Sequence, residues 1–371
     1  MNTDKGQQVF FELLRAGLWG KEARLLQYHD IDFSAIMKKA EEQSVVGLIT
    51  AGLEHIKDVI VPKEVTLQFI GSTLQIEQRN KVMNEFVAQL ISMLRKQGVY
   101  TLLVKGQGIA QCYERPLWRS SGDVDLFLSH ENYVKAKEVL MPQATNAEKE
   151  DGAKLHLAMV IKGWEIELHG TLHGHINSIN CVIDEVQYDV FCGGSVRSWM
   201  NGNTQVFLPG SDEDVFFVFT HILQHFYVEG IGLRQICDWC RLLWSFRDSI
   251  NYRLLESRLK KARIMDEWKA FAAFAVDYLG IPEETMPFYS DSWWWHRAAC
   301  KIKRFVLETG NFGHNRDMSY KKKYPFVIRY TKSFWMYTRI ALERFTISPR
   351  NAVLSWWAIL KMGANAAARA I

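Results

Sequence analysis

The spacing of hydrophobic residues changes twice along the chain, and this change constrains the fold more than any other feature of the sequence. From residue 7 to about residue 95, apolar residues recur at three- and four-residue steps, the period of an amphipathic α-helix. Asp32 precedes one of these runs and is expected to cap that helix. The helical period returns from Asp212 onward, with helices predicted over 214–226, 233–246, 252–262 and 267–279.

Between the two helical regions the sequence favours strands. Tyr100–Val104 and Val124–Leu128 are short β-favouring runs, and Met159–Leu168 contains a third with two-residue alternation. Short helices are expected over 107–113 and 131–140. The fold class predicted is therefore α+β, with a small mixed sheet. We expect three modules: helices over 1–95, an α+β core over 96–205, and helices over 206–371.

The overall charge and the N-terminal sequence indicate which partners and which cellular location to expect. A net charge of +4 is small for 371 residues and does not support a protein dedicated to nucleic acids or to membrane surfaces. The N-terminus lacks the pattern of a secretory signal, and the six cysteines are expected to be reduced thiols. We expect a cytoplasmic protein with no membrane partner, and a nucleic-acid partner is not favoured.

Two aspartates on one strand provide the strongest chemical signal. Side chains alternate along a strand, so Asp123 and Asp125 should share one face while Val124 and Leu126 point into the core. Two adjacent carboxylates repel each other unless a cation lies between them, and their hard oxygen atoms suit Mg²⁺. A third carboxylate is expected on a neighbouring strand, where Glu165, Glu167 and His169 share a face. Periodicity does not choose between the two glutamates.

Residues that favour phosphate lie upstream of the aspartates. Gly106 lets backbone N–H groups approach an anion at a predicted helix start, and Lys105 adds a positive charge. Arg119 is suited to bidentate contacts with phosphate oxygens. Each of these cations also has the simpler interpretation of a partner for a surface carboxylate.

The order of these motifs resembles that of the bacterial uncharacterised nucleotidyltransferase family, within the polymerase-β-like nucleotidyltransferase superfamily. The resemblance covers much of residues 5–250. It implies transfer of a nucleoside monophosphate from a nucleoside triphosphate such as ATP, with Mg²⁺ or Mn²⁺ as the cofactor. The motifs that carry it are Lys105-Gly106, Tyr113 with Pro116, Arg119, Gly122-Asp123-Val124-Asp125-Leu126, and Glu167-Leu168-His169.

The resemblance also implies roles for individual residues. Asp123, Asp125 and Glu167 match the three metal-binding, catalytic carboxylates. Lys105, Gly106, Arg119 and Gly122 are the expected nucleotide-binding residues, although Gly106-Gln107 departs from the usual Gly-Gly or Gly-Ser pair. Residues expected to lie next to the site are His169, His225, Arg234 and Asp238, the last two as an ion pair.

Other conspicuous residues have structural interpretations. His221 and His225, followed by Cys237 and Cys240, have zinc-ligand residue types, but both pairs lie in apolar helical runs that favour core packing. The tryptophans at 293–295 are expected to pack between helices rather than to stack on bases.

Three functions remain open from the sequence. The first is nucleotidyl transfer to the hydroxyl group of a small molecule, and the second is a toxin-like modification of tRNA or protein. The third is a catalytically silent scaffold or nucleotide-binding protein, which the three intact carboxylates argue against. The acceptor and the nucleotide base are not determined by the sequence.

Overall fold

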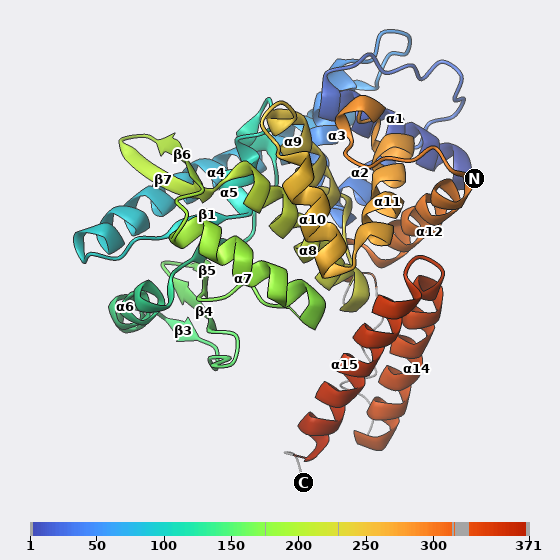
Figure 1. Cartoon of the computed structure of the whole chain (residues 1–371). Helices are drawn as coiled ribbons and strands as arrows, with labels where there is room; N and C mark the ends of the chain where they lie inside the picture. The colour runs from blue at the N-terminus through green and yellow to red at the C-terminus, as the bar shows by residue number, and fades with distance from the viewer. Residues whose placement is uncertain (1–2, 175, 229, 314, 316–325, 369–371) are drawn as a thin grey trace.

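A mixed β-sheet flanked by helices forms the centre of the computed structural model, which describes residues 3–174, 176–228, 230–313, 315 and 326–368 (Figure 1). Within these residues the sheet has seven strands in the order β3-β4-β5-β2-β1-β7-β6. The predicted α+β class is confirmed. The strands are β1 Leu102–Val104, β2 Val124–Phe127, β3 Asn146–Ala147, β4 His156–Ile161, β5 Trp164–His169, β6 Val196–Asn201 and β7 Thr204–Pro209.

The N-terminal region is helical, as its periodicity predicts. The side chain of Asp32 accepts a 3.0 Å hydrogen bond from the backbone N–H of Ala35, which confirms the expected helix cap. The two apolar runs between residues 63 and 96 belong to a single helix of 34 residues. The helices are α1 Thr3–Trp19, α2 Phe33–Glu42, α3 Val46–Glu54 and α4 Lys63–Lys96.

The sheet differs from the sequence prediction at two places. The run Met159–Leu168 contains parts of two strands, because Lys162 and Gly163 adopt positive φ values and form a turn between β4 and β5. The β6–β7 hairpin was not predicted, and β7 pairs with β1 at the centre of the sheet. The helices around the sheet are α5 Gly106–Ala110, η1 Pro116–Trp118, α6 His130–Leu140, η2 Met141–Gln143 and α7 Asn177–Phe191.

The two faces of the sheet pack against different helices. Val124 and Leu126 lie in a core that they share with apolar residues of α4 and α6. On the opposite face Phe127 joins the larger core, and its ring centroid lies 4.8 Å from that of Phe191 in α7. Asp125 alternates onto the same face as Phe127. The polar side chains of the central strands therefore face the helical C-terminal half of the chain.

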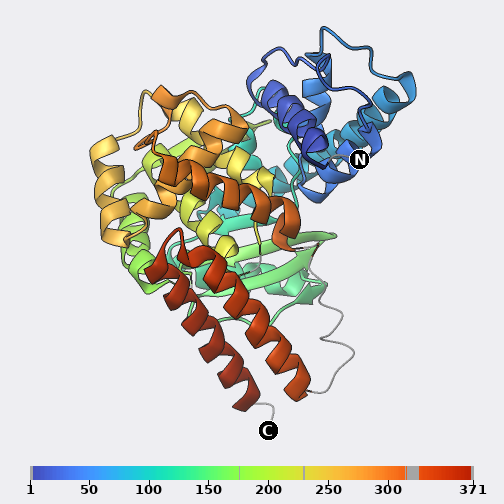
Figure 2. The same ribbon diagram turned by 90° about the vertical axis from the view of Figure 1, so that its right-hand side faces the viewer.

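The C-terminal helices complete the larger core together with the N-terminal ones. Gln43, at the end of α2, bonds with its side chain to the Val306 carbonyl and to the Leu233 N–H, both at 2.9 Å. The last two helices form a hairpin that projects from the body (Figures 1 and 2). These elements are α8 Ser211–Val228, α9 Leu233–Phe246, α10 Tyr252–Ala262, α11 Met265–Phe274, η3 Ala275–Leu279, η4 Glu283–Thr285, α12 Trp293–Thr309, η5 Asn311–Gly313, α14 Phe326–Phe345 and α15 Pro349–Ala368.

The predicted bounds of α9 and α10 agree with the structure. None of the helices in the described part of the chain has the length and apolar character needed to cross a membrane. The division into three modules stays a prediction. Residues from the N-terminal and C-terminal helices contribute to one hydrophobic core.

Glycines allow α1 and α3 to pack with their backbones in close approach. A Cβ atom at Gly17 would overlap the Leu48 carbonyl oxygen, and one at Gly52 would overlap the Leu13 carbonyl oxygen. Gly71, in the middle of α4, is exposed and has open space around it. The first two glycines are therefore required by packing, and the third is not.

We expect Gly17→Ala to lower the free energy of unfolding by about 3 kcal/mol, because backbone cannot yield as a flexible side chain does. Gly71→Ala, the matched control, should raise it by about 0.5–1 kcal/mol through helix propensity. Denaturant unfolding of both variants measures these changes. Equal effects of the two substitutions would show that the α1–α3 contact is looser than the structure indicates.

Candidate active site

The pairing of two strands brings the predicted carboxylates together. β2 runs parallel to β5, and in this register Asp125 is the partner of Glu167. Asp123 lies one residue before β2. One carboxylate oxygen from each of these three residues lies within 4.8 Å of the other two. Glu165 is exposed and lies nearer the start of β5. Among the described residues, the acidic group that contains both aspartates is therefore completed by Glu167.

Basic side chains of the protein lie against these carboxylates. Lys105 Nζ lies 2.7 Å from Asp125 Oδ1. His169 Nε2 lies 2.9 Å from the same Asp125 oxygen and 3.2 Å from Glu167 Oε2. His156 Nε2 lies 3.4 Å from Glu167 Oε2. The site thus consists of a row of alternating acidic and basic groups along one face of the sheet.

Burial and charge perturb the acidic members of this row in opposite directions. Burial raises the pKa of Asp125, and the ammonium group of Lys105 offsets only part of this effect. Burial also opposes ionisation of Glu167, but hydrogen bonds from His156 and His169 outweigh it and lower the pKa of that carboxyl group. Glu167 therefore holds its negative charge more firmly than Asp125 does.

Two of the basic members, His169 and Lys105, have raised pKa values although both are buried. The pKa of His169 is raised overall. Burial acts to lower it, but the hydrogen bonds of the imidazole to Asp125 and Glu167 have the larger effect. Burial likewise lowers the pKa of Lys105, and the charges of Asp125, Asp123 and Glu167 reverse the shift. Lys105 is therefore an ammonium group at neutral pH.

The turn after β1 determines where the Lys105 side chain lies. Val104 is the strand partner of Asp125, and the next residue, Lys105, adopts a φ of 57°. A left-handed conformation is uncommon for a residue other than glycine and is often found at functional positions. Gly106 follows with a φ of 40° and begins α5. This sharp strand-to-helix turn places the lysine beside Asp125 rather than along the strand.

A pocket lies over the carboxylates and is closed by helices from the C-terminal half of the chain. Its floor includes Gly106, Asp123 and Asp125, and α8 contributes Val218, His221 and Ile222. Burial lowers the pKa of His221 well below its usual range, so this imidazole is neutral. The remaining lining residues are Lys105, Ile109, Arg119, Arg234, Gln235 and Asp238.

Arg119 is held by a buried ion pair with α9. Its Nε and Nη2 atoms donate to the two carboxylate oxygens of Asp238 at 3.0 and 2.6 Å. Its Nη1 donates to the Ser120 carbonyl and to the Ser121 hydroxyl at 3.1 and 3.0 Å. Tyr113 donates its hydroxyl proton to Asp238 at 2.7 Å. Arg119 therefore connects the segment that leads to Asp123 with the helix above it.

The other residues singled out from the sequence lie in or beside this site. Arg234 lines the pocket, and its Nη1 donates to the Ser120 carbonyl at 2.9 Å. His225 lies beside His221, with their Nε2 atoms 3.1 Å apart. Gly122 is exposed next to Asp123, with open space around it. Asp238 forms an ion pair with Arg119, and the expected pairing of Asp238 with Arg234 stays a prediction.

Two contacts of the site were not expected from the sequence, one made by His156 and one by Tyr113, which was named only as part of a motif. His156 reaches Glu167 because β4 and β5 pair with His156 opposite His169. The two-residue turn at Lys162-Gly163 fixes this register and was the signal that could have revealed it. Tyr113 contacts Asp238 from a position 125 residues away in the sequence, which no local pattern indicates.

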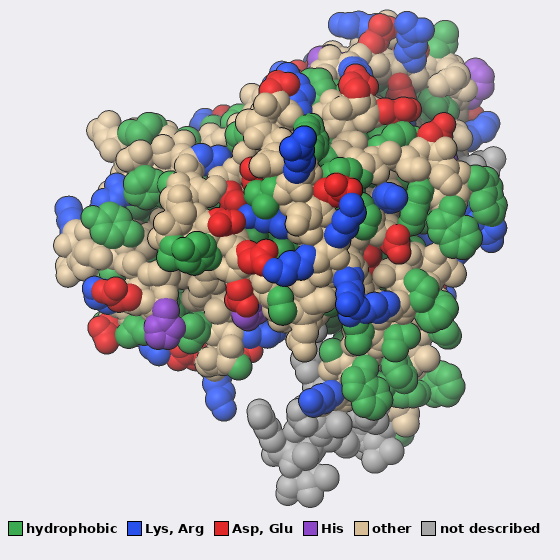
Figure 3. Space-filling view, viewed as in Figure 1, with side chains coloured by type: hydrophobic (Ala, Val, Ile, Leu, Met, Phe, Trp, Pro, Cys, Tyr) green, Lys and Arg blue, Asp and Glu red, His purple; other side chains and the backbone are tan. Residues whose placement is uncertain are grey.

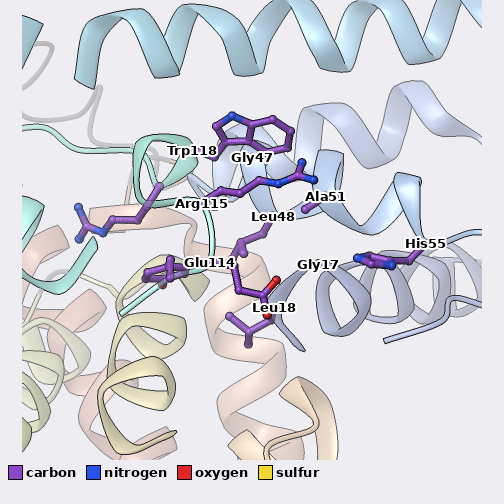
Figure 4. Close-up of a pocket in the computed structure, with 11 residues that line it drawn as sticks. Gly17, Leu18, Gly47, Leu48, Ala51, His55, Glu114, Arg115 and Trp118 are labelled. Atoms are coloured by element: carbon purple, nitrogen blue, oxygen red, sulfur yellow. The ribbon is translucent and has the colours of Figure 1, made fainter. Parts of the chain in front are cut away.

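A neighbouring pocket lies between α1, α3 and η1 (Figure 4). The guanidinium of Arg115 lies 4.2 Å from the ring centroid of Trp118 and forms two hydrogen bonds, of 2.8 and 2.6 Å, with Glu54. Arg119 and Tyr113 line this pocket from the side of the carboxylates. The chain thus has two bidentate arginine–carboxylate pairs near the site, one buried and one exposed.

We expect Asp238→Asn to lower the free energy of unfolding by about 3–5 kcal/mol, because it leaves the buried Arg119 guanidinium without a counter-charge. Glu54→Gln breaks the bidentate pair of Glu54 with Arg115, whose side chains are 46% and 45% exposed. This substitution should lower the free energy of unfolding by less than about 1 kcal/mol. Denaturant unfolding compares the two variants. Similar losses would contradict a dominant role of burial.

Comparison with known proteins agrees with this geometry. A family model described as "Uncharacterised nucleotidyltransferase" matches residues 29–280, which include the whole sheet and the helices α8 and α9. No curated protein and no solved structure matched the chain in these comparisons. The match spans more than half of the chain, and we conclude that the protein belongs to this family of uncharacterised nucleotidyltransferases.

Proposed function

We propose that this chain is a metal-dependent nucleotidyltransferase of the polymerase-β-like type, which transfers a nucleoside monophosphate from a nucleoside triphosphate to an acceptor hydroxyl. The observation that carries the proposal is the convergence of Asp123, Asp125 and Glu167 within 4.8 Å on adjacent parallel strands. The family match supports the reaction class. The family match does not specify the nucleotide, the acceptor or the metal, which are therefore part of this proposal.

The residues at the site fit a divalent cation. Three carboxylate oxygens form a hard-ligand set of the kind that Mg²⁺ and Mn²⁺ prefer. The basic groups of Lys105 and His169 lie against the same oxygens, which supports the binding of a cation there. When bound, the metal would neutralise charge on the triphosphate and on the attacking oxygen.

The protein's own groups would position the triphosphate. Lys105, displaced from Asp125 by the metal, would turn its ammonium group toward phosphate oxygens. Arg119 and Arg234 line the same pocket and add positive potential, and Gly106 and Gly122 leave backbone accessible next to Asp123. In phosphoryl transfer such positioning and charge stabilisation account for most of the catalysis.

Glu167 could act either as a metal ligand or as the base that deprotonates the acceptor. Its lowered pKa makes it a weaker base and a firmer ligand, which favours metal binding over proton abstraction. His221, neutral and on the opposite wall of the pocket, would accept a hydrogen bond from the acceptor hydroxyl. The proposal therefore assigns Glu167 to the metal and His221 to orientation of the acceptor.

Thermal shift with each of ATP, GTP, CTP and UTP tests the proposal, with Mg²⁺, with Mn²⁺ and with EDTA. A nucleotide at 100 times its Kd should stabilise the fold by about 2.7 kcal/mol. We expect a metal-dependent shift that Glu167→Gln abolishes. Glu165→Gln, on the same face of the same strand but outside the group of three, should retain it.

Two results would count against this assignment. If no triphosphate shifts the melting temperature of the wild-type protein, a silent scaffold becomes the better description. If Glu165→Gln abolishes the shift as completely as Glu167→Gln does, the third carboxylate has been assigned to the wrong residue. Pyrophosphate release with candidate small-molecule, tRNA and protein acceptors then identifies the acceptor class.

Replacement of Lys105 should change metal binding and nucleotide binding in opposite directions. Lys105→Met removes a cation 2.7 Å from Asp125, so the affinity for Mn²⁺ alone should rise by about tenfold or more. The affinity for the triphosphate should fall, since a phosphate partner is lost. Calorimetric titration measures both, with Lys81→Met at an exposed ion pair as the control. A loss of both affinities would contradict the proposed displacement.

A further inference from the structure

The C-terminal hairpin of α14 and α15 is anchored at its turn. Ile347 and Ala352 are buried in the main core. The Asn351 side chain donates to the Arg263 carbonyl at 3.0 Å and to Glu267 Oε1 at 2.6 Å. The rest of both helices stands out from the body (Figures 1 and 2). The hairpin is therefore fixed in direction while much of its length is exposed.

The two helices of the hairpin pack on each other through aromatic residues. The ring centroids of Phe334 and Trp356 lie 6.2 Å apart. Trp356 Nε1 donates to the Thr338 hydroxyl at 2.9 Å. These contacts occupy the inner face of each helix. The opposite face of each helix carries a different set of residues.

An outward stripe on each helix combines apolar and basic side chains at helical spacing. Trp335 is 69% exposed, Leu342 is 67% exposed and Trp357 is 64% exposed. The steps between members of a stripe are three or four residues, so they share one side of the helix. The outward stripes consist of Ile328, Lys332, Trp335, Arg339 and Leu342 on α14, and of Arg350, Leu354, Trp357 and Lys361 on α15.

The hairpin has a larger net positive charge than the whole chain. The two helices contain six Lys and Arg residues against one Glu, whereas the chain totals 45 basic and 41 acidic residues. Four of the six lie on the outward stripes, where Arg339 pairs with Glu343, and Arg344 is buried. The rest of the protein therefore has 39 basic against 40 acidic side chains. Figure 3 shows hydrophobic side chains gathered over this region, with Lys and Arg next to them. The partner of such a surface must be anionic and must also accept apolar side chains.

These two requirements distinguish between the candidate partners. A second copy of the hairpin would bring two strongly basic surfaces together, which like-charge repulsion opposes. A nucleic acid supplies negative charge and stacks on tryptophan, but offers nothing to the exposed aliphatic residues Leu342 and Leu354. The interface of an anionic bilayer accepts tryptophan, aliphatic and basic side chains together. Tryptophan lies at the headgroup level, aliphatic side chains enter the acyl region, and Lys or Arg contacts the phosphates.

We propose that the outward stripes of α14 and α15 bind the surface of a membrane that contains anionic phospholipids. The apolar residues enter the headgroup–acyl boundary without crossing the bilayer, and the basic residues contact lipid phosphates. This surface lies outside the residues that match the nucleotidyltransferase family. The proposal is independent of the proposed catalysis, and it revises the expectation of no membrane partner, for which the total charge of the chain was one ground.

Sedimentation of the full-length protein with vesicles tests this binding. We expect it to bind vesicles of phosphatidylcholine mixed with phosphatidylglycerol, and to bind poorly to phosphatidylcholine alone or at high salt. Arg350→Gln combined with Lys361→Gln, both exposed on α15, should weaken binding about thirtyfold, since each basic residue near the surface contributes about fivefold. Lys38→Gln combined with Lys57→Gln, at exposed positions of the N-terminal region, is the matched control and should change nothing.

A second variant separates lipid from nucleic acid. Leu342→Ser combined with Leu354→Ser should reduce vesicle binding and leave the melting temperature unchanged, because both side chains are exposed. Absence of binding to anionic vesicles at low salt would overturn the proposal. So would binding to single-stranded RNA that depends on Arg350 and Lys361 but is unaffected by the leucine substitutions. Asp123→Asn should bind vesicles normally, which keeps this test separate from that of catalysis.

Discussion

The parallel pairing of β2 with β5 is the constraint on which the candidate site depends. It sets Asp125 opposite Glu167, and strand alternation then turns both carboxylates toward α8 and α9 while Val124 and Ile166 fill the core behind them. Three acidic groups at this separation require cations. The protein supplies two such cations, Lys105 and His169, which both contact Asp125.

The helices above the sheet are tied to the site by one buried ion pair. Arg119 and Asp238 connect the segment before β2 with α9, and their side chains are 6% and 4% exposed. Since separating a buried pair is costly, the pocket wall and the segment carrying Asp123 behave as one unit. This coupling explains why Arg119 and Asp238 belong to the site although neither belongs to the group of three carboxylates.

The net charge of the chain does not show that basic residues are concentrated in the C-terminal hairpin. A net charge of +4 suggests no particular partner, yet the final hairpin alone carries five more basic than acidic residues. Positive potential over a surface of exposed tryptophan and leucine is a local property that sequence averages do not report. The catalytic candidates and the hairpin thus lie in parts of the chain with different charge and different exposure.

The sequence by itself determined the local features of this protein. Periodicity located the helices and three central strands, alternation placed Asp123 and Asp125 on one face, and the motif order indicated the family that the comparison confirmed. The resemblance already favoured Glu167, but only the tertiary structure brought it beside Asp123 and Asp125 and added the contacts of His156 and Tyr113. These contacts depend on strand register and on helix packing between residues far apart in the chain, whereas periodicity reports only which side chains share a face of one element.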